Sequence, residues 1–140
     1  LAPLSVFITN SEIMDLVFHA GSDGSTFGGY PLACVAGVTA IDVMQDENLV
    51  EKSANQGAIL KSKIKEIAAR SPHVKEVRGN GLFIGIEVKD SNAMVFCQQL
   101  LKMNMIANDS HGHTIRISPP LVINESEINY MLERLERVLV

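Results

Sequence analysis

The stretch that most constrains the fold runs from residue 74 to residue 89, VKEVRGNGLFIGIEVK, because its hydrophobic period is two. Every second residue from Ile84 to Val88 is apolar, as expected for a strand with one buried face. The glycines and asparagine at 79–81 interrupt the stretch and predict a turn. Two antiparallel strands packed by one face against a core are therefore predicted.

Helical periodicity flanks these strands. Apolar stripes predict helices from about Leu49 to Ala69, from Asn92 to Met103, and from a cap at Asn124, assisted by Glu127. The stripe of the first contains Leu60, Ile64 and Ile67, and that of the last contains Ile128, Met131, Leu132, Leu135, Val138 and Leu139.

Two more strands are predicted between the second and third helices. They cover about 105–107 and 114–118, with a turn at NDSHGH between them and Pro119 and Pro120 ending the second strand. Residues 49–140 are therefore predicted to form an α+β unit, with helices on one face of a small, mainly antiparallel sheet.

Residues 1–48 have a different pattern. A buried strand is predicted at 4–8, followed by a short helix that Thr9 and Glu12 would cap and that ends near Phe18. After a Gly/Ser loop, Pro31 begins a helix that is apolar nearly all round. Such a helix needs partners on several sides, so this region is predicted to belong to another layer.

The Gly/Ser loop, GSDGSTFGGYP at 21–31, has the donors that a phosphate needs. Glycines expose backbone amides, Ser25 and Thr26 add hydroxyls, and the following helix start adds partial positive charge. The lysine and residue order of a nucleotide-binding P-loop are missing from it. A flexible polar loop is an equally good interpretation of the same residues.

Arg116 is the second candidate. Thr114, Arg116 and Ser118 share one face of the predicted strand, where a guanidinium could bind both oxygens of a carboxylate. Composition alone favours the alternative of a surface arginine paired with an acid. For Arg78, a structural turn with a salt bridge is preferred over a ligand role. The histidines, including His111 and His113, show no metal-ligand spacing.

Charge and composition exclude some functions. The net charge of −4 gives no electrostatic reason to expect nucleic acid or an anionic membrane as a partner, and 46% apolar residues suffice for a core. No targeting signal or spanning segment is recognised. Cys34 and Cys97 are interpreted as buried thiols.

Three motifs in register carry a family resemblance: GSDGSTFGGYPLACVAGVTAIDVMQDENL, EVRGNGLFIGIEV and HTIRISPPLVINESEI. Together they resemble the C-terminal third of the class III (fold type I) pyridoxal-phosphate aminotransferases, with the ornithine aminotransferases most similar. The resemblance implies a remnant of the large cofactor-binding domain at 1–48 and the small domain at 49–140. It also implies that Ser25 and Thr26, Thr26 above all, contact the cofactor phosphate across a homodimer interface, and that Arg116 binds the substrate α-carboxylate.

Two loop positions depart from the family pattern, Asp23 and Tyr30. The larger departure is that the lysine forming a Schiff base with the cofactor has no counterpart in this chain, which is therefore expected to be an inactive fragment. The implied parent reaction transfers the δ-amino group of ornithine to 2-oxoglutarate, in the cytoplasm or the mitochondrial matrix. Acetylornithine or 4-aminobutyrate aminotransferase and a non-catalytic phosphate-binding or assembly module are the alternatives, and ISPPLVI modestly favours the ornithine enzymes.

Overall fold

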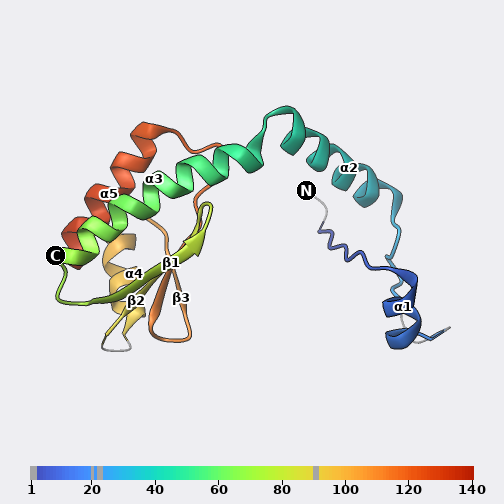
Figure 1. Cartoon of the computed structure of the whole chain (residues 1–140), viewed down its shortest axis with the longest axis horizontal. Coiled ribbons are helices and arrows are strands. Elements are labelled where there is room, and N and C mark those ends of the chain that lie inside the picture. The colour runs from blue at the N-terminus through green and yellow to red at the C-terminus, as the bar shows by residue number, and fades with distance from the viewer. Residues whose placement is uncertain (1–2, 20, 22–23, 90–91) are drawn as a thin grey trace. The chain divides into compact units, whose positions relative to one another are not determined.

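A computed structural model of the chain describes residues 3–19, 21, 24–89 and 92–140 (Figure 1). The chain divides into two compact units between Glu47 and Asn48. Residues 1–47 are called the first unit below, and residues 48–140 the second unit.

The second unit contains a four-stranded antiparallel sheet in the order β1-β2-β4-β3. Its strands are β1 (Val74–Asn80), β2 (Phe83–Val88), β3 (Asn108–Ser110) and β4 (Thr114–Ile117). Because β4 lies between β2 and β3, the helix after β2 carries the chain past the position of β4, and the chain returns into it by a hairpin.

Three helices complete this unit: α3 (Leu49–Arg70), α4 (Ala93–Lys102) and α5 (Glu125–Leu139). All three contribute to one core with the inward side chains of the strands. Its fully buried large members include Leu60, Ile64, Ile84, Ile86, Leu100, Ile115, Ile128, Leu135 and Leu139. The predicted α+β architecture, with helices on one face of a small antiparallel sheet, is confirmed.

Local sequence signals account for most of these boundaries. Asn124 caps α5 as predicted: its side chain accepts from the Glu127 amide, and the Glu127 carboxylate accepts from the Asn124 amide at 2.9 Å. The hairpin between β1 and β2 also forms, but β1 extends to Asn80, and the turn itself is Gly81 and Leu82.

The strand predicted at 105–107 is wrong, because β3 begins at Asn108. Asn108 pairs with Arg116 and Ser110 with Thr114, so the turn at 111–113 sets the register. Both His111 and Gly112 have positive φ there, 56° and 78°, which a tight turn requires. The turn predicted at NDSHGH is thus confirmed for residues 111–113, whereas residues 108–110 belong to β3.

The first unit contains α1 (Ser11–Val17) and α2 (Pro31–Asp46), the latter beginning with proline as predicted. The cap of α1 is Asn10, whose side chain accepts from the Ile13 amide at 2.9 Å, so the assignment to Thr9 is wrong. The strand predicted at 4–8 is absent from the described residues, where this segment has no partner strand for its backbone groups.

Only Ala33 is buried among the described residues of the first unit. The predicted burial of Cys34 is therefore wrong, since it lies on an exposed part of α2, whereas Cys97 is buried in α4 as predicted. Burial raises the pKa of the Cys97 thiol, which keeps it protonated and unreactive near neutral pH. Within the described residues, no helix is both long and apolar enough to cross a membrane.

Candidate functional site

The face of the sheet opposite the helices carries a row of side chains that crosses three strands. Gly85 on β2 pairs with Arg78 on β1 and with Arg116 on β4. Residues directly opposite one another in a sheet point to the same face. Two arginines therefore flank a residue that has no side chain.

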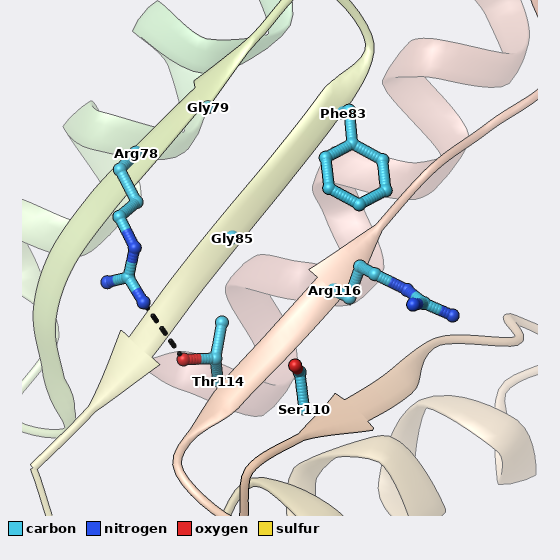
Figure 2. Close-up of a pocket in the computed structure, with 7 residues that line it drawn as sticks. All are labelled: Arg78, Gly79, Phe83, Gly85, Ser110, Thr114 and Arg116. Atoms are coloured by element: carbon cyan, nitrogen blue, oxygen red, sulfur yellow. Dashed lines mark hydrogen bonds between the residues drawn. The ribbon is translucent and has the colours of Figure 1, made fainter. Parts of the chain in front are cut away.

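This arrangement leaves a cavity of about 320 Å³ on the open face (Figure 2). Phe83 lies at one end, and the Arg116 Cζ is 6.0 Å from the centroid of its ring. The guanidinium of Arg116 points away from Arg78 (Figure 2) and also borders a second cavity, of about 280 Å³. The lining of the first cavity is Arg78, Gly79, Phe83, Gly85, Ser110, Thr114 and Arg116.

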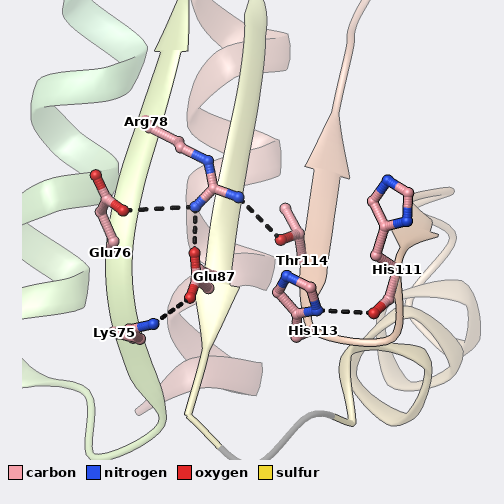
Figure 3. Close-up of polar contacts among 7 residues, drawn as sticks. All are labelled: Lys75, Glu76, Arg78, Glu87, His111, His113 and Thr114. Carbon is pink, nitrogen blue, oxygen red and sulfur yellow. Dashed lines mark hydrogen bonds and ion pairs between the residues drawn. The ribbon is translucent and has the colours of Figure 1, made fainter.

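Arg78 is held by a polar network across β1, β2 and β4 (Figure 3). It forms an ion pair with Glu87, a longer one with Glu76 at 3.5 Å, and a hydrogen bond from its Nη2 to the Thr114 Oγ1 at 3.3 Å. Lys75 binds the other oxygen of Glu87 at 2.5 Å. The predicted salt bridge of Arg78 is confirmed, although the residue lies within β1 and not in a turn.

The electrostatic consequence falls on Glu87. Hydrogen bonds from Lys75 and then from Arg78 lower the pKa of this carboxyl group below its usual 4.5. Glu87 is therefore ionised near neutral pH, and each of its oxygens has a cation.

Arg116 has the opposite environment. Among the residues that the structure describes, no carboxylate lies within 4.0 Å of its guanidinium. Its strand is fixed on both edges, by β2 and by β3, and the neighbouring Ile115 and Ile117 are buried in the core. A strand paired on both edges thus presents an exposed cation that no described acid neutralises, an arrangement suited to binding a carboxylate from solution.

The Gly/Ser loop belongs to the first unit. Ser25 and Thr26 are both exposed, and turns follow them: the Gly28 amide donates to the Ser25 carbonyl and the Tyr30 amide to the Phe27 carbonyl, each at 3.1 Å. Asp23, one of the two departures from the family pattern, lies outside the described residues.

The loop can be tested as a site for the cofactor phosphate. Its donors are two exposed hydroxyls and backbone amides before α2, which fit a phosphate group. All of these donors are neutral, because residues 1–47 contain six acids and no lysine or arginine. The seven lysines of the chain lie at 52–102, so the first unit itself has no amine side chain for the cofactor aldehyde.

The structure thus brings Ser25 and Thr26 together in one unit and places Arg116 in the other. The sequence reasoning missed Phe83 and Gly85 as neighbours of Arg116. The period-two pattern of β2 was the available signal, because it puts both residues on the face opposite the core. No cluster of three potential metal ligands lies within the described part of the chain.

Comparison with known proteins agrees with this architecture. A family model described as aminotransferase class-III matches residues 2–139. An ornithine aminotransferase of Macrococcus caseolyticus is 42% identical over 136 residues, which are 97% of this chain and 33% of that protein. An ornithine aminotransferase of Brevibacillus brevis is also 42% identical, over 98% of this chain and 33% of its own length.

Solved structures give the same result. Ornithine δ-aminotransferase of Plasmodium falciparum aligns with a TM-score of 0.85 and 34% identity, covering 94% of this chain and 35% of that one. Acetylornithine aminotransferase of Elizabethkingia anophelis aligns with a TM-score of 0.82 and 36% identity, over 94% and 35% of the two chains.

The chain belongs to the class-III aminotransferase family. Within that family, the curated relatives that match it at 42% identity are ornithine aminotransferases, of whose length it spans about a third. Enzymes of this family use pyridoxal 5′-phosphate, and the ornithine aminotransferase of Toxoplasma gondii has been solved with this cofactor at partial occupancy.

Proposed function

We propose that this chain is the C-terminal third of an ornithine aminotransferase, an enzyme that transfers the δ-amino group of ornithine to 2-oxoglutarate. Residues 1–48 would then be part of the large cofactor-binding domain, and residues 49–140 the small domain. The family match over residues 2–139 and the identity to ornithine aminotransferases support this assignment. The acetylornithine enzymes are the second candidate, supported by the structure from Elizabethkingia anophelis at 36% identity.

Arg116 binds the α-carboxylate of the amino acid or oxo acid in this proposal. One observation carries it: the guanidinium is exposed on a rigid strand beside a cavity of about 320 Å³ and has no acid within 4.0 Å among the described residues. A planar guanidinium can donate two parallel hydrogen bonds to a carboxylate, which fixes the orientation of the substrate as well as its position.

Ser25 and Thr26 donate hydroxyl hydrogen bonds to the cofactor phosphate, with Thr26 as the principal donor. The family resemblance implies that this contact crosses a homodimer interface, so we propose that two copies of the enzyme each complete the other's cofactor site. The donors of this loop are neutral, in a unit that carries six acids and no lysine or arginine, so they hold the phosphate by hydrogen bonds and the partial charge of the helix start.

The cofactor supplies the electron sink that transamination requires, and it needs a lysine to hold its aldehyde. The seven lysines here lie on helices or strands of the second unit or next to them, away from the Gly/Ser loop in sequence. We therefore propose that the lysine is supplied by another part of the full-length protein and that residues 1–140 alone do not catalyse transamination.

Steady-state kinetics of the full-length enzyme test the role of Arg116. Arg116→Ala should raise the KM for both the amino donor and 2-oxoglutarate roughly ten- to a hundred-fold, because a charge-assisted hydrogen bond contributes about 1.5–3 kcal/mol. Arg116→Lys keeps the charge but loses the planar pair of donors, so its KM values should lie between those of the wild type and those of Arg116→Ala. Unchanged KM values in Arg116→Ala would contradict the proposal.

A further inference from the structure

We propose that Arg78 is a positioning residue that keeps the Glu87 carboxylate away from Arg116, so that Glu87 does not compete with the substrate carboxylate for Arg116. This inference rests on the proposed function of Arg116. It assigns to Arg78 a role in substrate binding that acts through the position of Glu87.

The register of the sheet makes Glu87 the natural competitor. Glu87 lies two residues after Gly85 on β2 and so on the same open face. It pairs directly with Thr114, and Arg116 is two residues further along β4. Diagonal neighbours of this kind lie about 7–8 Å apart, with their Cβ atoms somewhat closer, within reach of two long side chains.

The observed network turns Glu87 in the other direction. One carboxylate oxygen binds Lys75 at 2.5 Å and the other binds Arg78, and both cations come from β1, on the side of β2 away from β4 (Figure 3). The side chain of Glu87 is only 14% exposed, so these contacts also hold it against the sheet. Its lowered pKa keeps it ionised near neutral pH, and it would attract a guanidinium if it were released.

Arg78 also has a second contact, which reaches β4. Its Nη2 donates to the Thr114 hydroxyl at 3.3 Å, so the guanidinium extends across β2 to β4 (Figure 2). Gly85 leaves room for this path, since a Cβ there would lie 3.1 Å from the Thr114 methyl group and 3.9 Å from the Arg78 Cγ. The two arginines on this face thus have different roles: Arg78 neutralises Glu87, and Arg116 stays available for the substrate carboxylate.

The test is a set of charge-deleting variants in the full-length enzyme. Arg78→Gln should raise the KM for 2-oxoglutarate about three- to ten-fold, the scale of one partly screened charge at this range, while kcat stays within about two-fold. Adding Glu87→Gln should restore the KM, because the competing charge is gone. Arg78→Lys should stay near the wild-type KM, because it retains the ion pair with Glu87.

Two further variants make the result specific. Lys75 is exposed, and Lys75→Gln removes the cation from the other oxygen of Glu87. This variant should also raise the KM, and adding Glu87→Gln should again restore the KM. It replaces Arg78→Gln in the test if that variant fails to fold. Arg70→Gln breaks an exposed Arg–Glu pair with Glu136 far from β4 in sequence and should leave the KM unchanged.

The outcomes separate this inference from the proposed function. If Arg116→Ala leaves the KM unchanged, the proposed function fails and the inference fails with it. If Arg116→Ala raises the KM but Arg78→Gln does not, only the inference is overturned. A raised KM that Glu87→Gln does not restore would show that Arg78 stabilises the sheet without positioning any charge, and would also overturn it.

Discussion

The two units of the chain are both rich in apolar residues, yet they place them differently. In the second unit the apolar side chains of three helices and of strands β1, β2 and β4 converge on one core that includes nine fully buried large residues. In the first unit α2 leaves Leu32, Val35, Val38 and Ile41 each more than half exposed. The second unit therefore contains the partners of its own helices, whereas the described residues of the first unit do not bury the apolar surface of α2.

Charge divides the chain at the same place. Residues 1–47 carry six acids and no lysine or arginine, whereas residues 48–140 carry all twelve basic residues and ten acids. All the guanidiniums of this 140-residue chain are thus in the second unit, and those of Arg78 and Arg116 are on strands of its sheet. The first unit offers neutral hydroxyl and amide donors, which suit a phosphate fixed by geometry.

The largest expected difference between the two units is in the effect of a leucine-to-alanine substitution on the free energy of unfolding. Leu135→Ala removes a side chain that is completely buried in the core, so it should lower the free energy of unfolding by about 2–5 kcal/mol. Leu32→Ala removes a side chain that is 66% exposed in α2, so it should change the free energy of unfolding by no more than about 0.5 kcal/mol. Urea denaturation of the chain measures both, and equal effects would remove the distinction between the units.

Two glycines, one in a helix of each unit, should show the same difference in packing with smaller changes in stability. A Cβ at Gly57 in α3 would lie 2.1 Å from the Gly81 backbone, so Gly57→Ala must move the helix or the hairpin and should destabilise the second unit by about 1–3 kcal/mol.

Gly37→Ala is the control. A Cβ at Gly37 in α2 meets the flexible Leu4 side chain at 2.4 Å, which can move, so the change should raise helix stability by about 0.5–1 kcal/mol. Amide hydrogen exchange in each helix reports both variants. A gain in protection for Gly57→Ala would contradict the close packing of α3 on the hairpin.

The smallest expected effect concerns the charges on the open face. The Glu87 pKa is lowered mainly by Lys75 and next by Arg78, so Lys75→Gln should raise it toward 4.5 more than Arg78→Gln does. A carboxyl group whose pKa is lowered by folding stabilises the fold at pH values above its pKa in the unfolded state. This stabilisation is lost as the pH falls through its pKa in the folded state. Side-chain NMR titration of Glu87 in the two variants measures both pKa changes. A larger increase in Arg78→Gln than in Lys75→Gln would mean that Arg78 is the dominant partner.

The sequence predicted the parts of the second unit whose signals are local. The stripe with Leu60 and Ile64, the alternation of Ile84 and Ile86, and the capping box at Asn124 each identify a structure from nearby residues. The position of β3 was missed because its register depends on a turn with positive φ at His111, which the hydrophobic pattern does not contain. The predicted strand at 4–8 failed for a related reason, since a strand requires a partner that its own pattern cannot supply.

The candidate site was predictable only in part. Strand alternation alone put Arg116 on the exposed face, opposite Ile115. That Gly85 would lie between Arg78 and Arg116 depends on the pairing of three strands from distant parts of the chain, which periodicity does not specify. That alternation made Arg116 a candidate for binding a carboxylate, and only the family resemblance assigned this carboxylate to the substrate, which stays a prediction.

The most direct test of this account is a crystal structure of the full-length enzyme with 2-oxoglutarate bound. We expect both α-carboxylate oxygens to accept hydrogen bonds from the Arg116 guanidinium, at N–O distances of about 2.7–2.9 Å, while Glu87 stays with Lys75 and Arg78. A substrate carboxylate bound by other residues, with Arg116 in solvent or paired with Glu87, would contradict it.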